Sequence, residues 1–220
     1  MKSISIHGRV GRREQRGAGS RAAILSAAAE AFAGSGLAGA RMDSIAEQAG
    51  VNKALLYYYF KSKESLYQAV VTDHFEEFNN HALEVLAGPG PARSVLLRYV
   101  AMHFDFICTR LRYASLYQQL ITSGGKPLEQ LVRKYFVPRS EALGRLLERG
   151  MRNGEFRRAD RMQTAISIVS MVVFYFSAAR VMHLMERADP YGKANLKRRK
   201  QEVLDFVRYG LFLHPEEPLK

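Results

Sequence analysis

The sequence predicts an all-helical protein, and three observations support this fold class. No segment shows the strict alternation of apolar and polar residues that a half-buried strand requires. Apolar residues instead recur at helical spacing in successive segments between residues 20 and 213. Glycine- and proline-rich breaks separate these segments, and Gly88-Pro89-Gly90-Pro91 is the strongest of them. We therefore expect about nine helices, which form a small N-terminal helical domain and a larger C-terminal one.

Residues 1–19 precede the first helical pattern and are expected to form a mobile basic arm. They contain five lysine or arginine residues, one glutamate and four glycines, without apolar residues at a regular spacing that could anchor a core. A solvated tail is the simpler interpretation. The alternative is an arm that contacts phosphates or the minor groove of DNA.

Four helices are expected between residues 20 and 86. Ser20, Asn52 and Ser62 are suitable N-caps, because their side chains can accept hydrogen bonds from the first amides of a helix. Gly36 ends the first helix, since glycine tolerates the backbone conformation that terminates helices. The expected helices cover residues 20–35, 42–49, 53–59 and 62–86.

Helical spacing continues to the C-terminus. Pro138 lies inside one of the segments, so that helix either begins there or is kinked. The expected helices cover residues 92–110, 112–123, 128–152, 159–187 and 195–213. Together with the earlier elements, they predict three parts of the chain, namely the arm of residues 1–19, a domain of residues 20–66 and a domain of residues 67–214.

Residues 45–66, IAEQAGVNKALLYYYFKSKESL, carry the most informative pattern. Two short amphipathic segments meet at Ala49-Gly50-Val51, and glycine allows the tight turn that a helix-turn-helix needs. A helical wheel of the second segment points Leu56 and Phe60 inward, whereas Ala54, Leu55 and Tyr58 point outward. In a DNA-binding helix-turn-helix, this second helix lies in the major groove.

The outward and flanking side chains are the candidates for DNA contacts. Tyrosine hydroxyls can bond phosphate oxygens, and tyrosine rings can cover thymine methyl groups. Packing between helices is the alternative for Tyr57 and Tyr59, and it is less favoured for Tyr58. Lys63 adds a positive charge to the exposed amides at the start of the next helix. The candidate residues are Arg41, Asn52, Lys53, Ala54, Leu55, Tyr57, Tyr58, Tyr59 and Lys63.

The segment from Ser20 to Val70 resembles the DNA-binding domain of the TetR family of bacterial transcriptional regulators. The matching residues are Ala28-Ala29-Glu30-Ala31-Phe32, Gly36, Ile45-Ala46, Ala49-Gly50-Val51, Leu56-Tyr57, Phe60, Lys63 and Leu66. The chain departs from the family at Ala40-Arg41, where a threonine or serine pair is usual, and Arg41 offers a charge-assisted phosphate contact instead. It also has Ala54-Leu55 in place of a small polar residue, which favours apolar contact with a thymine methyl.

The resemblance implies a homodimeric regulator of transcription that binds a palindromic operator on double-stranded DNA. It also implies a second domain that binds a small-molecule effector and dimerises. A repressor that the effector releases from the operator is the favoured interpretation. An activator, or a regulator without an effector, is the alternative.

The later helices are rich in aromatic and other apolar side chains that could line an effector cavity. Such a cavity needs apolar walls with a few polar groups, although plain core packing is the simpler interpretation of each residue taken alone. The best candidates for its lining are His103, Phe106, Tyr117, Tyr135, Met171 and Tyr175.

The last two expected helices have apolar residues on more than one face. Such helices need partners on more than one side, which pairing with a second copy of the chain would provide. We therefore expect a dimer through these two C-terminal helices. On this interpretation, Val207→Glu should place a charge in the interface and produce monomers.

Composition indicates the kind of binding partner and the cellular compartment. The formal net charge of +12 and the isoelectric point near 10.0 fit a polyanionic partner. The single cysteine, Cys108, excludes an internal disulfide and suits a reducing cytoplasm. The longest apolar run, residues 165–179, is interrupted by polar residues, and no secretory signal is present, so we expect a cytoplasmic protein without a membrane span.

Catalysis and metal binding are not expected. The six histidines lack the spacing of metal ligands, and no phosphate-binding loop or nucleophile motif is present. We therefore expect no cofactor and no enzymatic activity. The competing classes are an enzyme with an accessory helix-turn-helix and an architectural protein that binds DNA without sequence preference.

Overall fold

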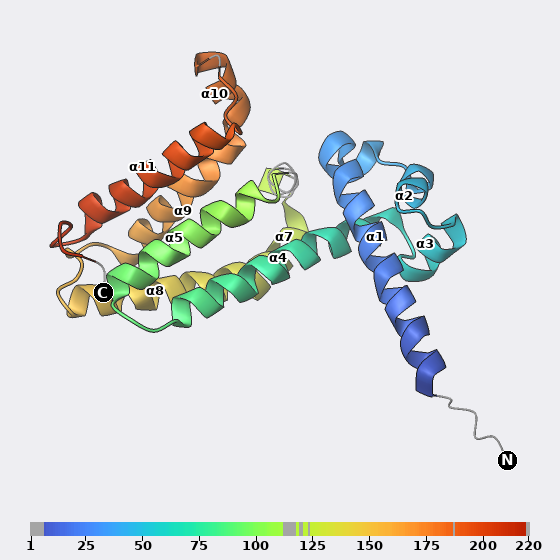
Figure 1. The fold of residues 1–220 in the computed structure, drawn as a ribbon, viewed down its shortest axis with the longest axis horizontal. Coiled ribbons are helices and arrows are strands. Elements are labelled where there is room, and N and C mark those ends of the chain that lie inside the picture. The colour runs from blue at the N-terminus through green and yellow to red at the C-terminus, as the bar shows by residue number, and fades with distance from the viewer. Residues whose placement is uncertain (1–6, 112–117, 119–120, 123, 187, 219–220) are drawn as a thin grey trace. The chain divides into compact units, whose positions relative to one another are not determined.

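The computed structural model describes residues 7–111, 118, 121–122, 124–186 and 188–218, with side chains from residue 19 onward except that of residue 186. The chain forms two compact units that divide between Asp73 and His74. Every regular element in the described part is a helix, and one isolated β-bridge joins Phe156 to Phe212 (Figure 1). The predicted all-helical fold class is confirmed.

The N-terminal unit contains three helices and the start of a fourth. These helices are α1 (His7–Gly39), α2 (Met42–Gln48), α3 (Lys53–Tyr59) and α4 (Lys63–Ala87). The apolar face of α1 packs against α2, and the ring of Phe32 meets that of Tyr67 edge to face at 5.2 Å between centroids. The fully buried side chains of the unit are Ile24, Ala28, Phe32, Ile45, Leu56 and Leu66.

Helix α1 begins earlier than the sequence predicted. It starts at His7 rather than near Ser20, so residues 7–19, expected in a mobile arm, continue the helix. A helix extends more easily than it nucleates, and no proline interrupts this segment. The helical conformation is interrupted at Gly36, where φ is 68° and ψ is 177°, at the residue that was expected to end it.

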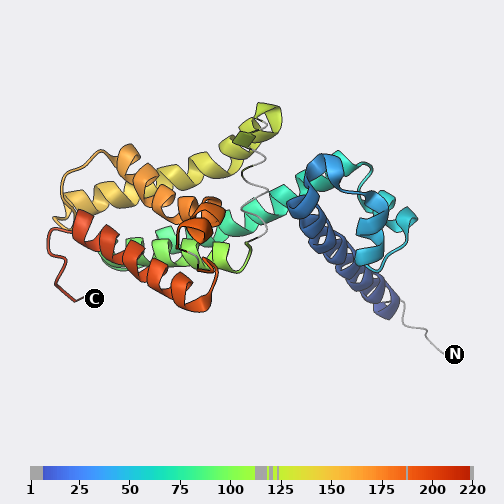
Figure 2. The same cartoon turned by 90° about the horizontal axis from the view of Figure 1, so that it is seen from above.

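The C-terminal unit is a helical bundle around α5 (Ala92–Cys108), which contacts α8, α9 and α11 (Figure 2). The first residues of this unit lie on α4, and Phe78, Ala82 and Leu86 of α4 belong to its core. The remaining elements are α7 (Gly125–Leu131), the π-helix η1 (Val132–Phe136), α8 (Val137–Arg152), α9 (Arg161–Ser177), α10 (Ala179–Glu186) and α11 (Lys193–Leu211).

Two expected helices of this unit are interrupted. Residues 128–152 pass through η1 before α8, because Pro138 has no amide hydrogen for the carbonyl four residues earlier. Residues 159–187 divide at Ala178 into α9 and α10, which meet at 66°. The hydroxyl of Tyr175 donates to the carbonyl of Pro190 at 2.7 Å, which supports the chain beyond the bend.

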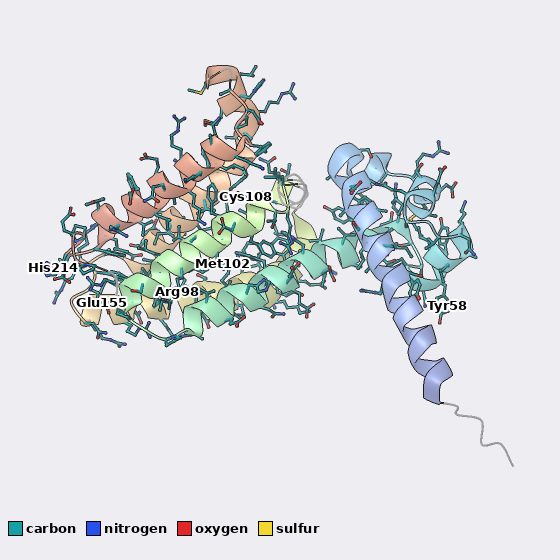
Figure 3. All side chains as sticks on the ribbon, in the orientation of Figure 1. Tyr58, Arg98, Met102, Cys108, Glu155 and His214 are labelled. Atoms are coloured by element: carbon teal, nitrogen blue, oxygen red, sulfur yellow. The ribbon has the colours of Figure 1, made fainter. Side chains whose placement is uncertain are left out.

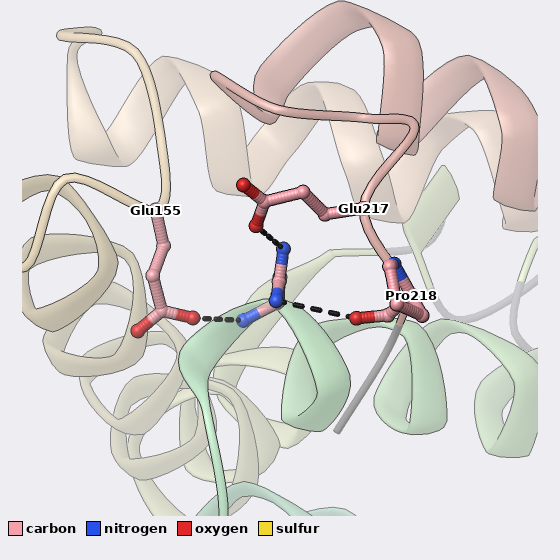
Figure 4. Close-up of polar contacts among 4 residues, drawn as sticks. Glu155, Glu217 and Pro218 are labelled. Atoms are coloured by element: carbon pink, nitrogen blue, oxygen red, sulfur yellow. Dashed lines mark hydrogen bonds and ion pairs between the residues drawn. The ribbon is translucent and has the colours of Figure 1, made fainter.

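Arg93 fixes the first turn of α5 to two distant segments. Its backbone N–H donates to the Glu155 carboxylate at 2.9 Å, where the helix N-terminus favours a negative charge (Figure 4). Its guanidinium donates to Glu217 at 2.9 Å and to the carbonyl of Pro218 at 3.3 Å. These contacts hold the loop before α9 and the C-terminal tail on the same end of the bundle.

The two faces of α11 differ in burial. Val203 and Val207 are buried in the core of their own unit, at 2% exposure each, whereas Phe206 is 68% exposed. The expectation that Val207 lies on an intermolecular surface is therefore wrong. A single apolar pattern could not separate the two faces, because both carry apolar residues.

Two segments of the described chain reach the length and hydropathy of a membrane-spanning helix. Residues 19–39 have a mean hydropathy of 1.3. Helices α9 and α10 are long and apolar enough only when the bent pair is counted as one segment. The sequence analysis did not identify the first segment as a candidate membrane span, and in the structure it belongs to the core helix of the N-terminal unit. Core helices of water-soluble folds have the same composition, so this property is weak evidence for a membrane span.

Candidate nucleic-acid interface

The turn between α2 and α3 has the backbone geometry that the sequence predicted. Gly50 has a φ of 66°, a left-handed conformation that costs other residues about 1–2 kcal/mol. The amide of Val51 donates to the carbonyl of Ala46 at 3.0 Å and closes the end of α2. Asn52 caps α3, because its Oδ1 accepts a 2.7 Å hydrogen bond from the amide of Leu55.

Helix α3 presents the two faces that its helical wheel predicted. Leu56 and Phe60 are buried, whereas Tyr58 is 78% exposed and projects from the helix (Figure 3). The rings of Tyr58 and Tyr59 meet edge to face at 5.4 Å between centroids, which restrains Tyr58 on the surface. Among the other candidates, Ala54 and Tyr57 are exposed, and Leu55 and Tyr59 are half-buried.

Lys53 lies at the start of α3 in an exposed ion pair. Its Nζ is 2.7 Å from Oδ1 of Asp43 in α2. This hydrogen bond and the charge of the partner lower the pKa of Asp43 and raise that of Lys53. The lysine is therefore charged and positioned beside the outer face of α3. Pairing with Asp43 reduces the positive charge that it offers to a phosphate.

Lys63 has a structural role as well as the predicted charge. Its Nζ donates to the carbonyls of Ala38 at 3.1 Å and Ala40 at 3.3 Å. An ammonium group carries three donors, so one more can bond a phosphate. Ser62 and Ser65 cap α4 reciprocally, each backbone amide donating to the other's hydroxyl at 3.1 Å.

Arg41 precedes α2 with an extended backbone, at φ −115° and ψ 129°. Its side chain is exposed and makes no capping hydrogen bond to α2. The missing cap agrees with the sequence, which has Arg41 where the family usually has a threonine or serine that could cap the helix. The exposed guanidinium is instead available for a charge-assisted contact.

A separate cavity of about 180 Å³ lies within the C-terminal unit. Of the predicted lining residues, His103 and Phe106 line it, whereas Tyr135, Met171 and Tyr175 do not. Tyr117 lies outside the described residues. The cavity is lined by His74, Phe75, Phe78, His103, Phe106, Ile107, Arg110, Phe136, Arg139, Val169, Val173, Phe176 and Ser177.

The lining residues that the sequence did not indicate come from α4, from the end of α5 and the turn after it, from η1, from the start of α8 and from α9. Phe78 and Phe136 are ordinary core residue types at helical spacing, so no sequence signal separates them from plain packing. Arg139 is the one unusual member, a charged residue that is only 8% exposed. Its position directly after Pro138, in the first turn of α8, was the available signal.

Both histidines of the cavity are uncharged at neutral pH. Burial lowers the pKa of His103 to about 3, and the charge of Arg139 lowers it further. Burial likewise lowers the pKa of His74 to about 3, with an added effect of Arg110. A neutral imidazole carries one donor and one acceptor. The cavity therefore combines two cationic side chains with two neutral polar ones.

The low pKa of His103 predicts an acid-sensitive fold. An unfolded histidine binds its proton near pH 6.5 and the folded one only near pH 3, so acidification between these values favours the unfolded chain. Between pH 7 and pH 5, His103 should remove about 2 kcal/mol from the free energy of unfolding. Urea titrations should show this loss in the wild type and a correspondingly smaller loss in His103→Gln. Equal losses in the two proteins would contradict the assignment.

The two-helix motif with an exposed outer face defines a helix-turn-helix DNA-binding protein. Residues 24–70 match the family model of bacterial regulatory proteins of the tetR family, and residues 95–207 match a tetracyclin repressor-like C-terminal domain. The chain therefore belongs to the TetR family and is a DNA-binding transcriptional regulator.

Two curated relatives illustrate this membership. The transcriptional repressor NicS of Pseudomonas putida is 28% identical over 182 residues, which cover 78% of this chain and 82% of NicS. The transcriptional activator FasR of Mycolicibacterium smegmatis is 39% identical over 87 residues. That match covers 40% of each chain, so the chain matches less than half of the length of FasR.

Solved structures share the fold at low sequence identity. FadR of Bacillus subtilis, in complex with stearoyl-CoA, has a TM-score of 0.63 and 22% identity, covering 84% of this chain and 96% of its own. A transcriptional regulator from Saccharomonospora viridis, in complex with choline, has a TM-score of 0.70 and 18% identity, covering 87% of this chain and 97% of its own.

Proposed function

We propose that the protein is a cytoplasmic repressor that binds a palindromic operator and is released by a small-molecule effector. The observation that carries the proposal is the exposed outer face of α3, which leaves Tyr58 free of the core. The relative NicS is named a repressor. An activator is the alternative, since FasR carries that name, and a regulator without an effector is a further one.

The proposed DNA contacts divide by chemistry. Arg41 and Lys63 supply positive charge for phosphates, and Lys53 does so once its pairing with Asp43 is weakened. Asn52 uses its side-chain oxygen as a cap, which leaves its amide nitrogen for DNA. Ala54, Leu55 and the tyrosines offer apolar and hydroxyl contacts to bases and sugars. The proposed contact set is Arg41, Asn52, Lys53, Ala54, Leu55, Tyr57, Tyr58, Tyr59 and Lys63.

The proposed dimer uses the exposed faces of the two C-terminal helices α9 and α11. Large apolar side chains are exposed on both and just beyond the end of α11, namely Ile166, Phe174, Phe206, Tyr209 and Leu213. Exposed apolar patches of this kind mark interaction surfaces. Two copies related by a two-fold axis would place two recognition helices on the two halves of a palindrome.

The proposed effector site is the cavity in the C-terminal unit. Its aromatic walls and few polar groups have the composition of small-molecule sites. The regulators that bind stearoyl-CoA and choline share this fold, which supports a ligand-binding role for the C-terminal domain. We retain the proposed domain limits, residues 20–66 for DNA binding and residues 67–214 for effector binding and dimerisation.

Selection of genomic fragments followed by competition tests this function. Fragments retained by the purified protein should share a palindromic sequence, and that sequence should bind at least about a thousandfold more tightly than random duplex at physiological salt. A protein that binds both duplexes equally would be an architectural DNA binder. That result would overturn the proposed function.

A further inference from the structure

The effector cavity contains a buried cation among aromatic rings. Arg139 of α8 is 8% exposed. Its guanidinium carbon lies 4.8 Å from the ring centroid of Phe78 and 4.8 Å from that of Phe136. These two rings hold the guanidinium in place by cation–π contact. The guanidinium therefore places a positive charge on the wall of the cavity, and hydrogen bonds that involve a charged group are about twice as strong as neutral ones.

The rest of the lining carries no negative charge. No aspartate or glutamate is among the described residues that line the cavity. Arg110 is the second cation, and it forms an ion pair with Glu77, which does not line the cavity. Its guanidinium lies 4.1 Å from the ring centroid of Phe106. The described lining therefore contributes positive side-chain charge from the two arginines and no negative side-chain charge.

His103 adds a polar group without a partner in the described part of the chain. Its Nδ1 is buried and makes no hydrogen bond there. Such a group is normally satisfied by a ligand or by water. The ring centroid of His103 lies 4.5 Å from that of Phe78, which Arg139 also contacts. The imidazole and the guanidinium therefore flank one aromatic ring and could bind the same ligand head group.

We propose that the cavity takes a compact organic anion, with its acidic head group on Arg139 and its apolar body against Val169, Val173 and Phe176. This inference rests on the proposed function, in which the cavity is the effector site. A carboxylate or phosphate would form charge-assisted hydrogen bonds with this guanidinium. A cationic ligand such as a quaternary ammonium would instead meet like charge in a low-dielectric site.

The volume of the cavity restricts the body of the ligand. Pockets for drug-sized ligands have volumes of roughly 300–1,000 Å³, whereas this one has about 180 Å³. A single ring or a short acyl chain fits such a space better than a long acyl chain does. Benzoate, phenylacetate and hexanoate are therefore suitable probes, and phenyl phosphate separates a phosphate head group from a carboxylate.

Calorimetric titration of the full-length protein tests the class of ligand. At least one of the acidic probes should bind at least about tenfold more tightly than its neutral counterpart, which is benzamide, phenylacetamide, hexanamide or phenol. Benzylamine should not bind. Equal binding of acids and neutral compounds, preference for the amine, or no binding of any acid would overturn the inference.

Variants of Arg139 test the assigned residue. Arg139→Gln should abolish the preference for the acid, and Arg139→Lys should retain part of it because the positive charge remains. Arg145→Gln is the matched control, since Arg145 lies on the same helix but does not line this cavity. A preference that persists in a folded Arg139→Gln protein would overturn the role of Arg139. If that variant does not fold, the wild-type comparison of acids with neutral compounds still tests whether the cavity prefers an anion.

Operator binding separates this inference from the proposed function. An acid that binds the protein without changing operator affinity supports the anion site and contradicts the proposed release mechanism. If the protein binds its operator specifically but binds none of the acids, the proposal of a DNA-binding regulator stands and the proposed anion site is wrong.

Discussion

A Tyr58→Ala variant should bind the operator about tenfold more weakly than the wild type and should be equally stable. Tyr58 is 78% exposed, so truncation removes little from the core of the N-terminal unit. The lost hydroxyl and ring contacts are together worth about 1–2 kcal/mol, and 1.4 kcal/mol corresponds to a factor of ten in affinity. Fluorescence anisotropy with labelled operator measures the affinity, and thermal unfolding measures the stability.

Tyr58→Phe is the matched control for this prediction. It keeps the ring and removes only the hydroxyl, so it separates a phosphate hydrogen bond from apolar contact with a base. A folded Tyr58→Ala protein with wild-type affinity would exclude the outer face of α3 from the interface.

Lys63 gives a less direct test of the same surface. Its ammonium bonds the carbonyls of Ala38 and Ala40, so Lys63→Ala alters the fold as well as any phosphate contact. Tyr58 has no comparable structural role.

The sequence was sufficient for the helix-turn-helix because local chemistry determines that motif. Gly50 fixes the turn, Asn52 caps α3, and the helical period separates Leu56 from Tyr58. The expected bounds of α3, residues 53–59, agree with the structure. Each of these features depends on residues within about ten positions of one another.

The bend between α9 and α10 could not be predicted in the same way. No glycine or proline lies at Ala178, so nothing in the local sequence predicts an interruption. The hydrogen bond from Tyr175 to Pro190 spans fifteen residues and forms only after the chain has folded back. Tertiary contacts therefore determine this boundary.

The cavity was only partly predictable for a related reason. His103 and Phe106 lie on one face of α5, and their polar and aromatic character was visible in the sequence. Phe78 and Arg139 come from other helices, and only the packing of α4, α5 and α8 brings them together. The sequence of one helix does not show which residues of another will face it.

The exposed apolar face of α11 gives the prediction with the largest effect. Phe206 is 68% exposed and Tyr209 is exposed beside it, whereas Val207 is buried. If two copies bury Phe206 against each other, Phe206→Glu would place two carboxylates in an apolar interface, where burial of unpaired charge is strongly unfavourable. The variant should be monomeric at micromolar concentration by light scattering, while the wild type is dimeric.

Loss of the dimer should reduce operator affinity by about a hundredfold or more, although α3 is unchanged. In a dimer the second recognition helix binds at an effective concentration near millimolar, and a monomer loses this advantage. Phe206→Leu keeps the surface apolar and should retain both the dimer and the affinity. Val207→Glu should instead destabilise the C-terminal unit itself, because Val207 lies in its core. A dimeric Phe206→Glu protein, or a monomeric wild type, would exclude this face of α11 as the dimer interface.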